Sequence, residues 1–349
     1  MKVLSQWIDV HHIGSHCAST AMRTIFLGYG YAFSEDLCFG LGSGLGFTYQ
    51  KYQSVDYYFF TGRNDSLEEN AVGILGGYIE TKRTDDPIVG WQWAKQWIDL
   101  GVPVILDLDM MYLPYMKDKL QIEQSFHFGL HNAILVGYDE EKSVAFLLDY
   151  LWNDVIEVSL KDLENARNSK TSPIKPDNGL KAIVLPKGQR DINLIINEAI
   201  RTNIFRMKRP FAFKMGLPGI KLFAREIRMW NKLLPEKERQ THAYMASMLF
   251  EKVGTGGGNF RRMYARYLKE CATLTGNQQY LNSYKNYMEL FRCWRQLAKL
   301  FELGAIDPNA GIFADDPEIE IFLEKMVDLE YKALENLEAI ISIKEVMTC

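Results

Sequence analysis

The chain has 349 residues, 47% of them hydrophobic and 24% charged, which is the balance of a globular protein with one large domain or two ordinary ones. A net charge of -4 argues against nucleic acid as a partner, and the longest apolar runs are too short to cross a membrane. The first residues, MKVLSQWIDV, lack the apolar core and cleavage site of an export signal. Five scattered cysteines are typical of reduced thiols, so we expect a cytoplasmic protein.

The predicted elements change in kind along the chain. In the first half, a helix is predicted directly after Cys17 and stops at Gly28, and four apolar runs are predicted strands. These runs are PVILDLDM (103–110), NAILVGYD (132–139), VAFLLDY (144–150) and KAIVLPKG (181–188). From about residue 188, long stretches with helical periodicity dominate, notably 280–301 and a helix that Asp316 and Pro317 open. We therefore predict an α+β domain over 1–188 and an all-helical domain over 189–349.

Cys17 is a candidate nucleophile. Apolar residues at 18, 21, 22, 25 and 26 lie on one helical face, which puts Cys17 at the start of that helix. The free N–H groups and the dipole of a helix N-terminus stabilise a thiolate. The alternative interpretation is a small buried hydrophobic residue, as most free cysteines are.

The base for this thiol is predicted to come from the hairpin HFGLHNAILVGYDEEKSVAFLLDY. If Asp139 to Glu141 form a three-residue loop, His131 and Asp149 lie opposite each other on one face. A carboxylate beside a histidine fixes its tautomer and stabilises its imidazolium form. Cysteine on a helix, then histidine and aspartate on adjacent strands, is the chain order of papain-like enzymes.

The neighbouring histidines do not form a metal site. His11, His12, His16 and Cys17 are too close in sequence for one tetrahedral zinc, and no other metal motif is present, so we predict no metal. His11 lies where papain-like enzymes often carry an oxyanion donor, and either its side chain or a backbone N–H could fill that role.

Two glycine-rich stretches are candidate ligand sites. The first, SEDLCFGLGSGLGFTY, lacks the glycine spacing of a nucleotide-binding loop, and its alternating glycines suit a backbone that other elements approach closely. Glu35, near its start, either caps the short helix before the glycines or binds a substrate amine. The second, GTGGGNFRRMYARYLKE, opens a helix, so Gly256, Gly257, Gly258 and Arg261 form either an anion site or a flexible turn.

Long segments of the chain resemble the butirosin biosynthesis protein H family. They are GSHCASTAMRTIFLGYGYAFSEDLCFGLGSGLGFTY, VILDLDMMYLPY and HNAILVGYD, and the second glycine run is similar to the helical domain often fused to that family. The resemblance implies a papain-like or C39-peptidase-like fold with Cys17 as nucleophile, His131 as base and Asp149 as its acidic partner. It also implies a helical domain that covers the cleft or forms the face of a homodimer.

The same resemblance implies an acyltransferase. Its donor would be a phosphopantetheine thioester on an acyl carrier protein or coenzyme A, its acceptor a small amine, and it would hold no bound cofactor. Asp109, Tyr112 and Tyr115 are then candidates to line the acceptor pocket, or else a turn cap and two packing residues, and the loop at Gly256 could hold the donor phosphate. The alternatives are a hydrolase or amidase, a cyclase with the same three residues, and a non-enzymatic carrier-binding module.

Overall fold

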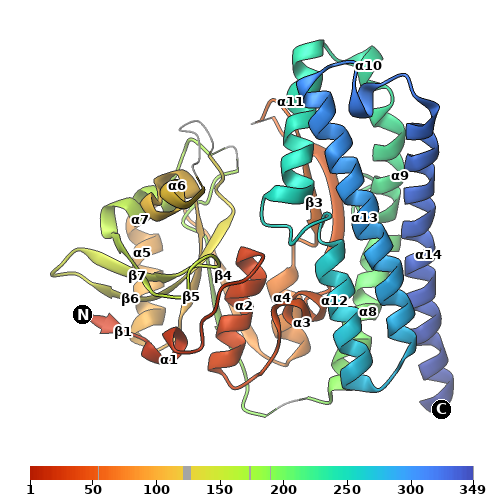
Figure 1. The fold of residues 1–349 in the computed structure, drawn as a ribbon. Coiled ribbons are helices and arrows are strands. Elements are labelled where there is room, and N and C mark those ends of the chain that lie inside the picture. Colours follow the sequence, from red (N-terminus) through yellow and green to blue (C-terminus); the bar gives the residue numbers. More distant parts are fainter. Residues whose placement is uncertain (54, 121–126, 173, 189, 349) are drawn as a thin grey trace. The chain divides into compact units, whose positions relative to one another are not determined.

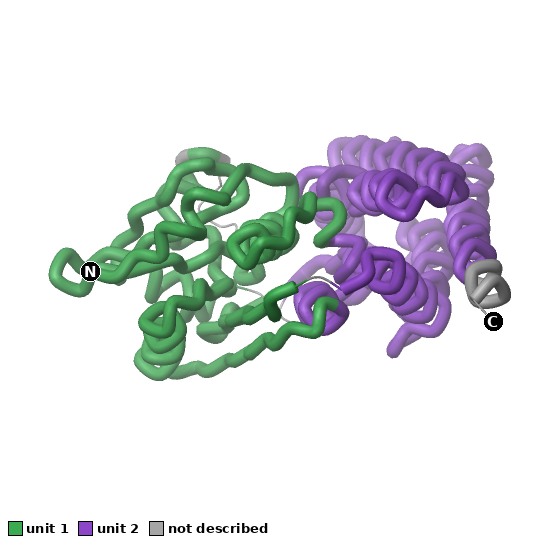
Figure 2. Tube along the Cα trace, turned by 90° about the horizontal axis from the view of Figure 1, so that it is seen from below, with its two compact units in different colours: residues 1–38, 75–189 green, residues 39–74, 190–349 purple. Residues whose placement is uncertain are grey.

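The computed structural model describes residues 1–53, 55–120, 127–172, 174–188 and 190–348. The chain forms two compact units (Figure 2). Unit 1 contains residues 1–38 and 75–189, and unit 2 contains residues 39–74 and 190–349. The fold is mixed α/β, with a large sheet in unit 1 and mainly helices in unit 2, as the sequence predicts (Figure 1).

Unit 1 is built on an antiparallel sheet. In the described part of the chain this sheet has seven strands, in the order β4 (Tyr78–Lys82), β9 (Leu180–Val184), β5 (Val104–Leu108), β6 (His131–Asp139), β7 (Val144–Leu148) and β8 (Ile156–Ser159), with β1 (Lys2–Val3) paired to β6. Every residue of β5 and β6 is buried, which explains why both read as continuous apolar runs in the sequence. The four predicted strands correspond to β5, β6, β7 and β9.

Short helices pack against this sheet and close its core. They are α1 (Ser5–Ile8), α2 (Cys17–Gly28), α5 (Pro87–Asp99), η1 (Met110–Tyr112), α6 (Pro114–Leu120) and α7 (Leu160–Arg167). Helix α2 contacts β6, and α5 contacts both β5 and β6. Ile98 of α5, Leu106 of β5 and Leu135 of β6 belong to one buried cluster, so the centre of the sheet is fixed on this side by apolar packing.

Unit 2 combines a hairpin with long helices. The hairpin is β2 (Leu45–Lys51) and β3 (Tyr58–Arg63), followed by α4 (Leu67–Ile74); α3 (Glu35–Leu41) spans the division between the units. The helices are α8 (Ile192–Lys208), α9 (Gly216–Ile227), α10 (Trp230–Leu233), α11 (Glu236–Ser247), η2 (Met248–Lys252), α12 (Arg261–Thr275), α13 (Gln279–Ile306), η3 (Gly311–Phe313) and α14 (Pro317–Thr348). In α13 the predicted stripe is buried at Tyr280, Tyr287, Trp294 and Phe301.

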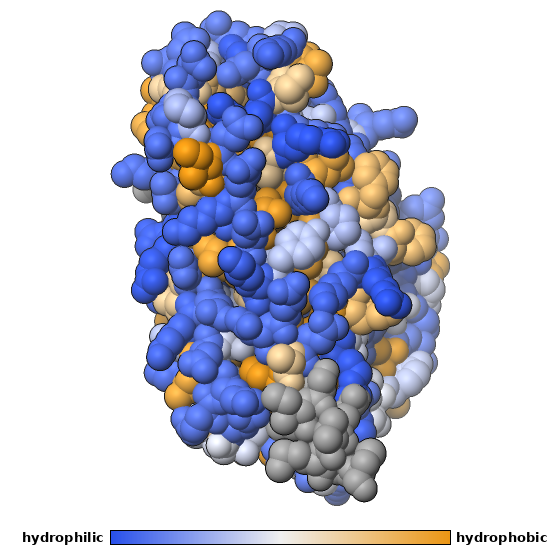
Figure 3. All heavy atoms as spheres, turned by 90° about the vertical axis from the view of Figure 1, so that its right-hand side faces the viewer, coloured by the Kyte–Doolittle hydropathy of each residue, from blue (hydrophilic) through white to orange (hydrophobic). Residues whose placement is uncertain are grey.

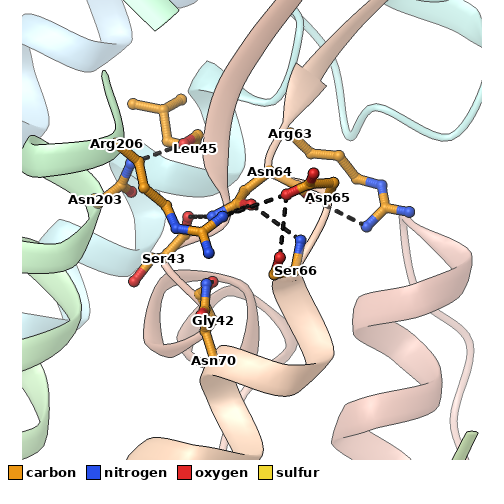
Figure 4. A network of polar contacts seen from close by, with 10 residues as sticks. All are labelled: Gly42, Ser43, Leu45, Arg63, Asn64, Asp65, Ser66, Asn70, Asn203 and Arg206. Atoms are coloured by element: carbon orange, nitrogen blue, oxygen red, sulfur yellow. Dashed lines mark hydrogen bonds and ion pairs between the residues drawn. The ribbon is translucent and has the colours of Figure 1, made fainter. Parts of the chain in front are cut away.

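Polar contacts attach residues 39–74 to the helices of unit 2 (Figure 4). The amide of Asn203 on α8 donates to the carbonyl of Leu45 at 2.7 Å, and Arg206 donates to the side chain of Asn64. The hydroxyl of Ser43 donates to the carbonyl of Ala199, also on α8, at 2.9 Å. These contacts join groups that lie far apart in sequence, and they place residues 39–74 with the C-terminal helices. The domain boundary at residue 188 remains a prediction.

The alternating glycines of this segment lie where neighbouring groups approach its backbone. A Cβ atom on Gly40 would lie 2.1 Å from the ring of Tyr267, and one on Gly42 would lie 2.4 Å from the carbonyl oxygen of Leu67. Both distances are far below van der Waals contact, so a side chain at either position would displace a neighbour. The interpretation of this stretch as a closely approached backbone is confirmed.

On the face that lies on the side of α14, hydrophilic residues predominate and apolar side chains are interspersed among them (Figure 3). Of the helices in the described residues, none combines the length and the apolar character needed to span a lipid bilayer.

Candidate active site

Cys17 is the first residue of α2 and is partly exposed. His16 before it has an extended backbone and caps the helix, because its ring Nδ1 accepts a hydrogen bond from the backbone N–H of Ser19 at 3.3 Å. The unpaired N–H groups of a first turn and the helix dipole favour negative charge at this end. The prediction that Cys17 opens a helix is therefore confirmed.

The carboxylate of Glu35 holds the turn that precedes Cys17. It accepts hydrogen bonds from the backbone N–H groups of Ser15 at 3.0 Å and His16 at 2.8 Å, and from the hydroxyls of Ser19 and Thr20 at 3.0 Å each. Four protein donors occupy this buried group. In this structure Glu35 therefore fixes the loop in front of the thiol instead of offering a free carboxylate to a substrate amine.

His131 and Asp149 are in direct contact. The Nε2 atom of His131, the first residue of β6, lies 2.7 Å from Oδ2 of Asp149, and both side chains are buried. The ring nitrogen left for another partner is Nδ1. A hydrogen bond with the thiol of Cys17 contributes to the titration of His131, so the structure brings together all three residues of the predicted triad.

The register that achieves this contact differs from the predicted one. Val144 pairs with Asp139, so the connection is 140–143 and not the predicted Asp139–Glu141 loop, and the register shifts by one between Leu135 and Gly137. Because one residue of slip changes the face, this irregularity decides which side Asp149 occupies. Extended beyond the Ile134–Leu148 pair, the register puts Asp149 opposite Ala133, on the same face as His131.

The charge of Asp149 governs the titration of His131. Burial lowers the pKa of His131, but the carboxylate of Asp149, its hydrogen bond and the adjacent Cys17 together raise that pKa to about 10. The raised pKa favours the imidazolium form of His131 at neutral pH. An imidazolium beside a thiol at a helix N-terminus is the setting in which a thiolate persists.

Two tyrosines complete this group. The hydroxyl of Tyr115 on α6 donates to Oδ2 of Asp149 at 2.8 Å, whereas the sequence suggested that Tyr115 lines an acceptor pocket. The ring of Tyr150 lies 5.9 Å from that of His131, and its backbone N–H donates to Oδ1 of Asp149 at 2.7 Å. Burial, followed by the charges of Cys17 and Asp149, raises the pKa of Tyr150. Sequence reasoning missed Tyr150, although its place directly after Asp149 was a usable signal.

His11 is a structural residue in this arrangement. Its Nε2 lies 3.1 Å from the carbonyl oxygen of Asp149 and 3.0 Å from that of Trp152, and its Nδ1 lies 2.8 Å from the hydroxyl of Thr24. Burial lowers the pKa of His11, so the ring is neutral and donates from Nε2. With both nitrogens engaged by protein groups, His11 anchors the segment around Asp149 and offers no free oxyanion donor.

Asp109 is satisfied by protein groups as well. Its fully buried carboxylate accepts from the backbone N–H of Met111 at 3.1 Å and from Ser169 at 2.6 Å, and lies 2.8 Å from Nδ1 of His127. Asp109 therefore caps η1 and does not face an ammonium group. Tyr112, the last residue of η1, is partly exposed, and its hydroxyl lies 3.1 Å from that of Thr171.

The second glycine run binds an anion supplied by the chain itself. The N–H of Gly258 donates to the carboxylate of Glu251 at 2.7 Å, and that of Gly257 donates to Thr255 at 3.1 Å. Gly256, Gly257 and Gly258 all have a positive φ.

Arg261, at the start of α12, is fully buried. It pairs with Glu330 at 2.8 Å and stacks over Trp294. The pair lies inside unit 2, and the buried Arg261 has no access to a donor phosphate.

Two family models match the chain. Residues 16–150 match the model of Butirosin biosynthesis protein H, N-terminal, and residues 161–337 match that of a Domain of unknown function (DUF4872). The chain belongs to the butirosin biosynthesis protein H-like family. The description of this family indicates a biosynthetic enzyme. No curated protein matches the chain.

The family match encloses the contacts described above. It begins at His16 and ends at Tyr150, so Cys17, His131 and Asp149 all lie inside it. In the described residues, no group of three or more histidine, cysteine or acidic side chains is arranged to hold a metal ion.

Proposed function

We propose that this chain is a cysteine-dependent acyltransferase. Cys17 is the nucleophile, His131 transfers protons, and Asp149 orients His131 and stabilises its imidazolium form. The observation that carries the proposal is the direct 2.7 Å contact between Asp149 and His131, with the thiol of a helix-opening cysteine as a further hydrogen-bond partner of His131. This arrangement also supports a papain-like or C39-peptidase-like fold for the sheet-bearing region.

In the first step the thiolate of Cys17 attacks the carbonyl carbon of a thioester. A bond forms between Sγ and that carbon, and the donor sulfur leaves with its bonding electrons. The imidazolium of His131 gives its proton to the departing thiolate, which yields a free thiol and a neutral histidine. Because one thioester replaces another, the step is nearly balanced in energy.

In the second step an amine attacks the acyl-enzyme. The neutral His131 accepts a proton from the amine nitrogen as the carbon–nitrogen bond forms. The bond between carbon and Sγ breaks, and Cys17 returns to its thiolate form beside the imidazolium. The net change is one thioester and one amine converted into one thiol and one amide.

We propose a phosphopantetheine thioester as donor, carried by an acyl carrier protein or coenzyme A, and a small amine as acceptor. The enzyme requires no bound cofactor for either step. Since both nitrogens of His11 are engaged, the oxyanion of each tetrahedral intermediate is assigned to backbone N–H groups in the first turn of α2, starting with that of Cys17.

The test is a product analysis with acyl-pantetheine thioesters and a panel of small amines. An acyltransferase yields amide and free pantetheine thiol, and Cys17→Ala and His131→Ala abolish both. Free acid formed at the same rate with or without amine identifies a hydrolase, and a cyclised acyl chain identifies a cyclase.

Cys293 provides the matched control. It is also partly exposed but lies in α13, so Cys293→Ala keeps full activity. Thiol release that persists in Cys17→Ala contradicts the proposal.

A further inference from the structure

Two donors share one oxygen of the Asp149 carboxylate. Oδ2 accepts from Nε2 of His131 at 2.7 Å and from the hydroxyl of Tyr115 at 2.8 Å, and Oδ1 accepts from the backbone N–H of Tyr150 at 2.7 Å. Asp149 is 1% exposed and His131 is 2% exposed, so water does not screen this competition. Each donor on the carboxylate reduces the negative charge available to the others.

Packing fixes Tyr115 in this position. Its ring lies edge-on to that of Trp152, with 4.9 Å between the ring centroids. The carbonyl of Trp152 accepts a hydrogen bond from His11, which ties this segment to the loop before α2. Burial and the Asp149 carboxylate raise the pKa of Tyr115 well above its ordinary value, so the hydroxyl stays protonated and donates.

We propose that Tyr115 is a positioning residue that weakens the hold of Asp149 on the proton of His131. The inference rests on the proposed function, in which His131 must give up a proton and later accept one. In the resting protein both the thiolate and Asp149 stabilise the imidazolium. In the acyl-enzyme the thiolate is gone, and the hydrogen bond from Tyr115 leaves His131 neutral enough to accept the proton of the amine.

The groups that surround His131 define what the variants change. They are Cys17 from α2, Asp149 and Tyr150 from the segment after β7, Tyr115 from α6, and His11, which reaches the carbonyl of Asp149. Tyr115→Phe removes one donor from Asp149 and alters none of the other titratable groups.

The first test follows the titration of His131 by NMR in protein whose Cys17 is alkylated with iodoacetamide, which requires no substrate and leaves the sulfur uncharged, as in the acyl-enzyme. In Tyr115→Phe, Asp149 holds the imidazolium more strongly, so the pKa of His131 should be higher than in the wild type. We expect the midpoint of the His131 titration to rise by about half to one pH unit, because a hydrogen bond to a charged group is involved. Tyr112→Phe is the control, since its hydroxyl contacts Thr171 and not Asp149.

A second variant reverses the sign. Site-specific 3-fluorotyrosine at position 115 is a stronger donor of the same shape, so the midpoint of the His131 titration should fall. If Tyr115→Phe does not fold, this variant decides the matter alone. A midpoint that matches the Tyr112→Phe control, or shifts of the same sign in both variants, overturns the inference.

The amine step separates this inference from the proposed function. In single-turnover reactions of the acyl-enzyme, Tyr115→Phe should move the pH profile of amide formation to higher pH. If no acyl-enzyme forms in any variant but the His131 midpoints shift as expected, the acyltransferase proposal fails and the role of Tyr115 stands.

Discussion

Glu35→Gln tests whether the buried carboxylate in front of Cys17 fixes the reactive turn. Glu35 accepts from two backbone N–H groups, those of Ser15 and His16, and from the hydroxyls of Ser19 and Thr20. All four donors contact Oε1, and the N–H of Ser15 also lies 3.0 Å from Oε2. Glutamine has the same shape, and its oxygen can take the place of Oε1 and keep those four contacts without the charge. Its NH2 group then replaces Oε2 and faces the N–H of Ser15 donor against donor.

The structure sets the size of the effect. Hydrogen bonds to a charged group contribute about 1.5–3 kcal/mol each, and a buried donor left without an acceptor costs about 1–3 kcal/mol. Losing the charge and at least one contact should lower the free energy of unfolding by about 2–4 kcal/mol. Because Cys17 follows the held turn directly, its alkylation rate at neutral pH should fall roughly tenfold or more as the turn loosens.

The assay pairs urea denaturation with iodoacetamide kinetics. Glu140→Gln is the matched control, because Glu140 is exposed and forms a surface ion pair with Lys95. That control should change the free energy of unfolding by less than about 1 kcal/mol. If Glu35→Gln behaves like Glu140→Gln in both measurements, the carboxylate does not organise this turn.

Three further perturbations have definite expected outcomes. Asp149→Asn should lower the turnover of thioester and amine roughly 10³-fold while the protein stays folded, because the amide cannot stabilise the imidazolium of His131; unchanged turnover would remove Asp149 from the mechanism. Because the pKa of His131 is raised from 6.5 to about 10, the folded state binds the extra proton across that range, so the free energy of unfolding should fall as pH rises from about 6.5 towards 10. Urea titrations of wild type and His131→Gln over this range should differ in slope, and equal slopes would contradict the shift. Arg261→Met leaves Glu330 buried without its partner and should lower the free energy of unfolding by about 3–5 kcal/mol, whereas adding Glu330→Leu should recover much of it; a near-neutral single variant would show that the pair contributes little.

Local chemistry was enough to predict much of the candidate site. Cys17 is followed by an apolar helical stripe and then by Gly28, so the helix start could be located from spacing alone. His131 begins a continuous apolar run and Asp149 ends the next one, so their approach follows from a hairpin. The register shift between Leu135 and Gly137 was missed, although a glycine inside a strand pattern, here Gly137, is a usable signal of a bulge.

Long-range contacts account for what the sequence did not reveal. The attachment of residues 39–74 to the helical unit depends on Asn203 and Arg206, more than a hundred positions away, and a polar helical residue gives no sign of its partner. The sequence makes Asp109 and Glu35 candidates to bind a ligand. Only the structure identifies the protein donors that fill their carboxylates.

The measurement that tests the central claim most directly is the mass of the intact protein after brief exposure to an acyl-pantetheine thioester, followed by peptide mapping. We predict a mass increase equal to one acyl group, located on the peptide that contains Cys17, absent in Cys17→Ala and removed by added amine. An unlabelled protein whose Cys17 also resists iodoacetamide would contradict covalent catalysis and favour a carrier-binding role.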